Sequence, residues 1–494
     1  MCVTSSSMEI TMIKIHIKMK TMKYLFIAAL VTVFSTAAKA QTGTPADIDA
    51  VKKIISSKPA DLDKQIKPYY KENRKNPELL TGFGRAFYEA KDTARARIYA
   101  EYALEAVKNH QFAPAFILLG DLKALADDGG AAAQYYDMAV YADPKNPDGY
   151  YKYANVYRKL SPSSAVAKLN DLRVQRPDIA VDALAGRIYY MSNDFDKALA
   201  SYDKADKNKM EDRDLTDYAM AAFFKQKNQK ALDIAKFGLT KKPRSAAFNR
   251  LAFFNSTDLK QFDQALQYAD ALFNKSDSAK FSYYDYVYYG KALAGAKRHK
   301  EAVAMYEKAL QQEDLDNKAK RAGVIKDLSD AYQQQEDYPN AIKHYEDYLN
   351  NIDKATANDI AALASLHMQH GGTLQDADAK KAAFEKADKV YADLAANYEN
   401  AAEYANFMRA RVNAQLDPDS KLGLAKPYYE KLIELIEPRA EKDATERARI
   451  IESYRYMIAY YFIVKEDKEQ AKIYAEKLIQ IDPENETAKQ VLAL

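Results

Sequence analysis

The sequence predicts an all-α protein in which pairs of helices repeat along the chain. One frame of small and bulky residues recurs at intervals of 33 to 46 residues. The 494-residue chain has only 15 glycines and 15 prolines, fewer than a turn-rich β-protein would carry. Its 48% hydrophobic and 29% charged residues are typical of a folded protein rather than a disordered one.

The first 40 residues have the pattern of a secretory signal peptide. Three lysines within residues 18–23 precede an apolar run at residues 24–34, and a small-x-small motif follows at residues 38–40. The run is shorter than the ~20 apolar residues that span a bilayer. We therefore expect cleavage before Gln41 and a soluble periplasmic or secreted protein; an uncleaved N-terminal anchor is the alternative.

Charge and cysteine content exclude several classes of function for the mature chain. After residues 1–40 are removed, 68 basic and 69 acidic residues remain, so the net charge is −1. A near-neutral chain argues against a nucleic-acid binder with a long phosphate track. The only cysteine is Cys2, so the mature chain has no disulfide, thiolate nucleophile or cysteine metal ligand. No later segment is long and apolar enough to be a membrane span.

The repeat is carried by an alanine frame on one face of the second helix of each pair. Ala198 and Tyr202 follow the pattern Ala-x3-Tyr-x2-Ala, and Ala302 and Tyr306 follow it again. An alanine, tyrosine or leucine stands four residues after each frame alanine. The frame alanine occurs at positions 96, 132, 165, 198, 231, 265, 302, 341, 387, 425 and 471.

A small residue, for example Gly84 or Gly120, stands twelve positions before many of these alanines. Large apolar residues flank it, such as Phe83 before and Phe87 after Gly84. Two antiparallel helices approach closely only where both present small side chains, and the bulky neighbours fill the space around the crossing. We therefore predict one tight helix crossing in each unit.

This pattern resembles the tetratricopeptide repeat (TPR) family, and the leader suggests an exported bacterial member. The family's tryptophan is absent, and Tyr, Phe, Leu or Ile takes its place. The resemblance covers about eleven units over residues 77–483 and implies a right-handed α-solenoid, a superhelix with a concave groove. The clearest unit reads Tyr286-x2-Tyr289-Gly290-x2-Leu293-x8-Ala302-x3-Tyr306-x2-Ala309.

The spacing of the frame predicts how the chain is divided. Residues 77–277 form a regular array, and residues 278–483 form a looser array with insertions. An extra helical pair is expected at residues 45–76 and a capping helix at residues 484–494, because a solenoid must cover the exposed faces at its ends.

Catalytic and metal-binding motifs are not recognisable in the sequence. No nucleophile elbow, His-Glu-x2-His motif, phosphate-binding loop or dinucleotide fingerprint is present. His367 and His370 have the i, i+3 spacing of two metal ligands, but no third ligand stands at a matching turn. We interpret them as a helix-end pair and predict a protein that is not an enzyme and has no cofactor, metal or catalytic residue.

The TPR resemblance implies that the first helix of each unit lines the concave wall. Positions one and four after the small residue, and three before it, are then expected to face inward. Arginine and tyrosine are frequent among them, and both are common at interface hot spots. The predicted groove comprises Arg85, Tyr88, Tyr151, Asn155, Arg158, Arg187 and Tyr190, with Ile117 and Asp121 at the same positions of another unit.

We expect this wall to bind an extended peptide or an acidic group of a protein partner. The alternative is a hydrated wall whose arginines pair with neighbouring acids. The predicted function is a non-catalytic, protein- or peptide-binding scaffold of the bacterial cell envelope, present as a monomer or a partner-bound assembly. A helical glycan-binding protein and an α/α-toroid carbohydrate-active enzyme are the alternatives. Eleven units argue against a toroid, and the absence of Trp argues against both.

Overall fold

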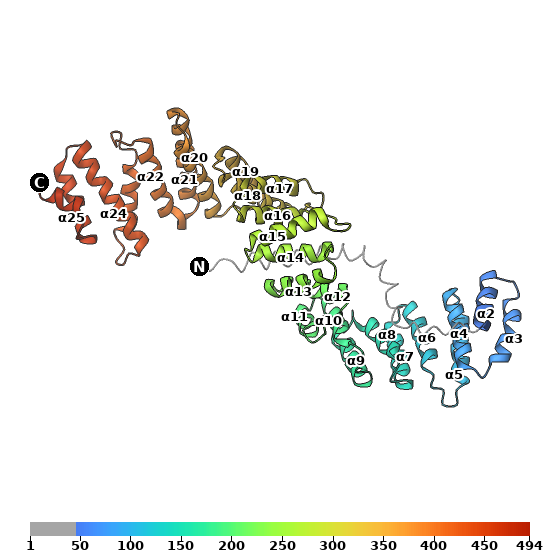
Figure 1. Cartoon of the computed structure of the whole chain (residues 1–494). Helices are drawn as coiled ribbons and strands as arrows, with labels where there is room; N and C mark the ends of the chain where they lie inside the picture. Colours follow the sequence, from blue (N-terminus) through green and yellow to red (C-terminus); the bar gives the residue numbers. More distant parts are fainter. Residues whose placement is uncertain (1–45) are drawn as a thin grey trace. The chain divides into compact units, whose positions relative to one another are not determined.

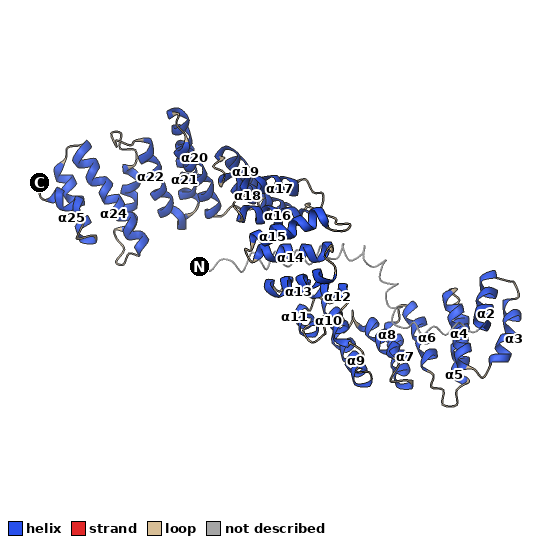
Figure 2. Cartoon of the chain, in the orientation of Figure 1, coloured by secondary structure: helices blue, strands red, loops and turns tan. Residues whose placement is uncertain are grey.

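The computed structural model describes residues 46–494, and the predicted leader at residues 1–40 lies outside them. The described residues form 25 α-helices, short 3₁₀ and π segments and no β-strand (Figures 1 and 2). The prediction of an all-α solenoid is confirmed by this part of the chain.

The chain divides into two compact units between Val181 and Asp182. The described part of the first unit contains α2 (Ala46–Ser57), α3 (Leu62–Asn73), α4 (Pro77–Glu89), α5 (Thr93–Glu105), α6 (Ala113–Leu125), α7 (Gly129–Ala142), α8 (Pro147–Tyr157) and α9 (Pro162–Gln175).

The second unit begins within α10 (Val181–Met191) and continues through α11 (Phe195–Tyr202), α12 (Asp212–Phe224), α13 (Asn228–Lys241), α14 (Ala246–Asp258), α15 (Phe262–Asp270), α16 (Tyr283–Gly295), α17 (His299–Leu310), α18 (Lys318–Gln333) and α19 (Tyr338–Asn351). It ends with α20 (Ala357–Thr373), α21 (Ala377–Asn397), α22 (Ala402–Leu416), α23 (Lys426–Ile436), α24 (Ala444–Ala459), α25 (Lys468–Ile481) and α26 (Glu486–Leu492).

From α4 to α25 the helices alternate as the first and second members of eleven pairs, as the sequence frame predicted. Neighbouring helices pack on each other, so each pair covers the apolar face of the next one within its unit. The pair α2 and α3 precedes the array, and α26 packs on α25 at the other end. The predicted division at residue 277 stays a prediction.

The alanine frame marks the helix crossings. The frame alanines of the second helices, Ala96 and Ala302 among them, are fully buried. A Cβ atom added to Gly120 would overlap the ring of Tyr136, and one added to Gly290 would overlap the ring of Tyr306. The small residue of the first helix therefore accommodates the bulky residue of the second.

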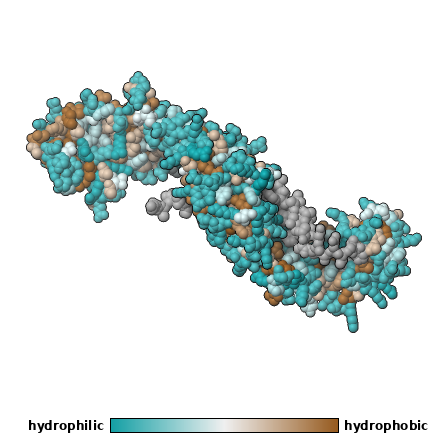
Figure 3. All heavy atoms as spheres, in the orientation of Figure 1, coloured by the Kyte–Doolittle hydropathy of each residue, from teal (hydrophilic) through white to brown (hydrophobic). Residues whose placement is uncertain are grey.

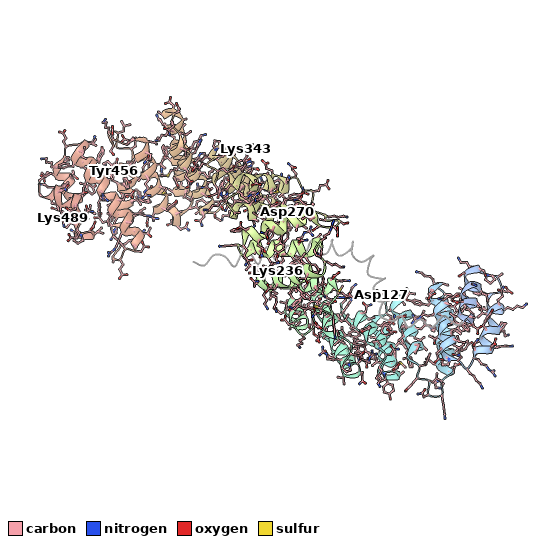
Figure 4. All side chains as sticks on the ribbon, viewed as in Figure 1. Asp127, Lys236, Asp270, Lys343, Tyr456 and Lys489 are labelled. Atoms are coloured by element: carbon pink, nitrogen blue, oxygen red, sulfur yellow. The ribbon has the colours of Figure 1, made fainter. Side chains whose placement is uncertain are left out.

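The turn inside a pair has a recurring backbone solution. The residue before the second helix's N-cap is left-handed, as at Lys91 with φ 68° and Asp127 with φ 59°. Figure 4 labels Asp127. The next residue is an aspartate in several pairs, and its carboxylate accepts a hydrogen bond from the helix, as Asp92 does from the Arg95 amide. This capping satisfies an amide that the new helix leaves unpaired.

Departures from the regular spacing lengthen particular helices. α20 has 17 residues and α21 has 21, so the additional residues of this pair extend its two helices. The surface in view is mostly hydrophilic with scattered apolar spots (Figure 3). Among residues 46–494, no helix combines the length and the apolarity that crossing a bilayer requires.

Candidate binding face and its inter-repeat junctions

The seven predicted groove residues belong to the first helices of three pairs. Arg85 and Tyr88 are on α4. Tyr151 and Asn155 are on α8, and Arg158 is its C-cap. These five belong to the first unit, whereas Arg187 and Tyr190, on α10, belong to the second. Within each of the two compact units, we call the surface formed by the first helices of the successive pairs the first-helix face.

Asp121 is the centre of a polar cluster on the first-helix face of the first unit. Its carboxylate is 6% exposed and accepts a hydrogen bond from the Tyr136 hydroxyl at 2.9 Å. Lys152 donates to the same oxygen at 2.7 Å, and Arg85 forms an ion pair with the other oxygen. Burial and the Asp121 charge both raise the pKa of Tyr136. Three successive first helices, α4, α6 and α8, are thus joined through one carboxylate.

Arg187 is similarly engaged within the second unit. Its guanidinium donates to Asp214 at 2.8 Å and to Glu211 at 2.9 Å. The Arg187 side chain is only 12% exposed. Two of the three predicted groove arginines, Arg85 and Arg187, therefore already pair with acids of the following first helix or its N-terminus. The role of the predicted groove in binding stays a prediction.

The predicted groove tyrosines are partly buried. Burial raises the pKa of Tyr88, Tyr151 and Tyr190. Ile117 does not face a groove, because it is 4% exposed and packs in the core of the first unit. A pocket of about 280 Å³ opens between first helices, lined by Tyr88, Asp121, Ala124, Leu125, Tyr136, Lys152, Asn155 and Val156.

Ion pairs between successive first helices continue along the second unit. Arg250 contacts Asp285 at 2.6 Å, and Arg411 contacts Glu452 at 2.7 Å. Sequence reasoning missed these pairs, because their partners stand about one repeat apart. A search for opposite charges at repeat-length spacing on the first helices would have found them.

Six pairs have a tyrosine four residues after the frame alanine, and four of these also have a small residue twelve positions before that alanine. We call the construction of these four pairs a tyrosine-floored junction. Its floor is the tyrosine four residues after the frame alanine. One side is the residue that follows the small residue in the first helix of the same pair. The other side is the residue two positions before the small residue in the first helix of the next pair. The four junctions are Asp121–Tyr136–Lys152, Arg187–Tyr202–Asp217, Lys291–Tyr306–Asp327 and Asp330–Tyr345–Ala362.

Three of the four junctions place a basic residue on one side and an acidic residue on the other. Lys152 bonds to Asp121 as described, and Lys291 lies 3.9 Å from Asp327. In the third, burial raises the pKa of Asp217 to about 7, against the charge of Arg213 at 3.8 Å and the weaker effect of Arg187. The fourth junction places Asp330 opposite Ala362.

The fourth junction is open to solvent as a pocket of about 180 Å³. α18 contributes Asp330 to its wall, α19 contributes Tyr345, and α20 contributes the far side. The pKa of Asp330 is raised, because the effect of burial exceeds the opposing effect of the nearby Lys326 charge. The full lining is Lys326, Asp330, Gln333, Tyr345, Asn358, Asp359, Ala362, Ser365 and Leu366.

The histidine pair of α20 lies near this region but has no metal-binding partner set. His367 is buried, and burial lowers its pKa to about 4, followed by the charges of Lys386 and His370. His367 is therefore neutral at physiological pH. Within residues 46–494, no group of three or more His, Cys, Asp or Glu side chains is arranged to hold a metal ion.

No protein-family model matches the chain, and no curated protein matches it. Solved structures do resemble it. The C-terminal part of a TPR repeat-containing protein from Cytophaga hutchinsonii is 25% identical with a TM-score of 0.43, over 56% of this chain and 99% of that one. A tetratricopeptide repeat protein from Parabacteroides merdae is 17% identical with a TM-score of 0.32, over 52% of this chain and 98% of that one.

A third structure, the APC/C hetero-tetramer Cut9–Hcn1, is 13% identical with a TM-score of 0.30, over 90% of this chain and 96% of that one. The solenoid fold of this chain is shown by its own eleven helix pairs and by the residue frame at their crossings.

Proposed function

We propose that this chain, a tetratricopeptide-repeat solenoid, is a non-catalytic scaffold of the bacterial cell envelope that binds an extended peptide segment of a partner protein. The observation that carries the proposal is the recurrence of tyrosine-floored junctions on the first-helix faces, two of which open as pockets. A tyrosine-lined pocket at the same position of a repeat suits the side chain of an extended peptide that lies along the first helices. The envelope location is supported by the leader-like pattern of residues 1–40.

The residues available to a partner in the first unit are the tyrosine and amide side chains rather than the arginines. Asn155 is exposed, Tyr88 is partly exposed, and both line the Asp121 pocket. Tyrosine offers a large, rigid contact area with a polar tip, which suits it to peptide recognition. Arg85 is paired with Asp121 in the pocket wall, and its guanidinium carbon lies 5.9 Å from the centroid of the Tyr88 ring.

The test is a peptide-library pull-down with residues 41–494, followed by affinity measurements with the captured peptides. We expect Tyr88→Ala to weaken binding at least tenfold, because it removes an aromatic wall of the pocket. Tyr141→Ala is the matched control, since Tyr141 is a 74% exposed tyrosine on the second helix α7. Loss of binding with Tyr141→Ala but not with Tyr88→Ala would move the binding surface to the second helices.

Substitution of Arg187 is a poor test of the same face. Arg187→Ala would leave Asp214, a buried acid, without its main cation. The resulting destabilisation would lower binding for a reason unrelated to contact with a partner.

A further inference from the structure

The junction at Tyr345 lacks the cation that its counterpart at Tyr136 obtains from within the chain. The two pockets use equivalent positions of the repeat. Both include the acid after the small residue of a first helix, Asp121 or Asp330, and the floor tyrosine of the second helix. Lys152 stands on the opposite side of one pocket and Ala362 on the opposite side of the other.

The match continues along the far wall of each pocket. Relative to the buried residue Ala154, α8 contributes the positions two before, one after and two after, which are Lys152, Asn155 and Val156. Relative to the fully buried Ala364, α20 contributes the same three positions, Ala362, Ser365 and Leu366. The first pocket thus shows which group satisfies this arrangement of an acid and a tyrosine.

Two polar groups of the Tyr345 pocket are left without the bonds that their counterparts make. The Tyr345 hydroxyl is buried without a hydrogen-bond partner, and the residue is 2% exposed. Within residues 46–494, the Asp330 carboxylate forms no hydrogen bond or ion pair, although Lys326 acts on it through its charge. At the other junction, Tyr136 and Lys152 both bond to Asp121. A buried hydroxyl without a partner costs free energy that a ligand can recover.

The surrounding charges leave the pocket with an excess of negative charge. Asp327 has Lys291 at 3.9 Å, and Asp359 has Lys326 at 3.8 Å and the Tyr348 hydroxyl at 3.1 Å. Asp327 and Asp359 thus each have a partner, whereas Asp330, the third acid, has no hydrogen-bond or ion-pair partner among residues 46–494. A cationic group therefore enters a site whose net charge is −1, even with Lys326 in its wall.

We propose that the pocket between α18, α19 and α20 binds the primary ammonium group of a lysine side chain of the partner. The ammonium donates hydrogen bonds to the Asp330 carboxylate and the Tyr345 hydroxyl oxygen, while Ala362 and Leu366 border the side-chain methylenes. The proposal rests on the proposed function, because the lysine belongs to the bound peptide. Lys152, which bonds to Asp121 from within the chain, occupies in the first pocket the place that the partner's lysine takes in the second.

The experiment uses an array of random 15-residue peptides, synthesised once with lysine and once with Nε-acetyl-lysine, and residues 41–494. Acetylation removes the charge and keeps the methylenes. We expect the unmodified peptides to bind at least tenfold more tightly. Ala362→Lys supplies the missing cation from the chain, and Asp330→Asn removes the acid, so each is expected to abolish this preference. Ala382→Lys, at an exposed position of α21, is the control and leaves the preference unchanged.

The outcomes separate the two proposals. Peptides that bind with no preference for lysine, or with a preference that survives both Ala362→Lys and Asp330→Asn, would overturn the lysine pocket and leave peptide binding intact. If no peptide binds to the wild-type chain, the proposed function fails, and the lysine pocket fails with it. A circular dichroism melt of each variant shows that its helices are retained.

Discussion

The Asp121 junction of the first unit and the Asp330 junction of the second have the same backbone construction and opposite electrostatic states. In the first, the carboxylate is 6% exposed and bonds to Tyr136 and Lys152, with Arg85 as a third partner. In the second, alanine takes the place of the lysine, and the Asp330 carboxylate has no hydrogen-bond or ion-pair partner among residues 46–494. The comparison shows that one position of the repeat decides whether a junction stabilises the array or remains available to a ligand.

The largest expected effect comes from removing each acid in turn. Asp121→Ala leaves Arg85, Lys152 and Tyr136 without their common acceptor, and we expect a loss of about 3–5 kcal/mol of stability. Asp330→Ala removes an unpaired, exposed acid and is expected to change stability by less than about 0.5 kcal/mol. Hydrogen exchange of the amides of α6 to α8 and of α18 to α20 measures both. Equal effects at the two sites would contradict the comparison.

The Arg187–Tyr202–Asp217 junction has its base and its acid on the opposite sides from the Asp121–Tyr136–Lys152 junction. Burial raises the pKa of Asp217 to about 7, whereas the same carboxyl group has a pKa near 3.8 in the unfolded chain. Between these values the folded state holds a proton that the unfolded state has lost, so stability falls as pH rises from about 4 to about 7. Asp217→Asn removes this pH-dependent loss of stability, which is about 4 kcal/mol at about 1.4 kcal/mol per pKa unit.

The measurement is denaturant unfolding of wild type and Asp217→Asn between pH 4 and pH 8. The stability difference between the two is expected to grow across this range in favour of the variant. Of the groups around Asp217, Arg213 and Arg187 stay charged and Tyr190 and Tyr202 stay neutral between pH 4 and pH 8. Asp214 is coupled to Asp217, so the difference reports the two acids together. A constant difference would mean that Asp217 is already ionised at pH 4.

The tyrosine floor can be tested through the small residue that accommodates it. Gly120→Ala places a methyl group in the ring of Tyr136 and is expected to cost about 1–3 kcal/mol. Gly323→Ala, in α18, is the control, because a Cβ atom added there would meet no other residue within 4 Å. There the loss of unfolded-chain freedom is expected to raise stability by about 0.4–1 kcal/mol. Thermal melts of both variants test this difference in sign.

The smallest expected effect is the repair of the open junction. Ala362→Lys introduces the cation that the Asp121 junction has, and we expect a gain of about 0.2–1 kcal/mol, typical of a solvent-accessible ion pair. The gain is measured by denaturant unfolding at low salt and is expected to shrink at 1 M salt, because screening weakens an exposed pair. A gain independent of salt would indicate packing rather than charge.

The helix pairs could be predicted from the sequence because close packing at each crossing demands particular residue sizes. Gly120, Gly290 and the buried alanines meet that demand at regular spacing, and the structure confirms the crossings. An extra pair and a capping helix were expected because a solenoid must cover the faces at its ends. Residue size is a local property, so it is visible one unit at a time.

The electrostatic state of the first-helix faces was not predictable in the same way. Arg85 and Arg187 occupy positions that the TPR resemblance assigns to the concave wall, yet acids of the next repeat engage both. Ile117 stands at such a position and is buried, because α6 is apolar on almost every side. Which partner a charge finds depends on side chains about one repeat away, and a single-repeat frame does not contain that information.

The shared construction of the junctions has an evolutionary consequence. The residue two before the small residue is lysine, aspartate or alanine in different repeats, while the small residue and the floor tyrosine keep the crossing in place. A replacement at this one position can therefore exchange an internal tie for a ligand contact without rebuilding the core. Repeats that arose by duplication can diverge in what they recognise while they continue to fold in the same way.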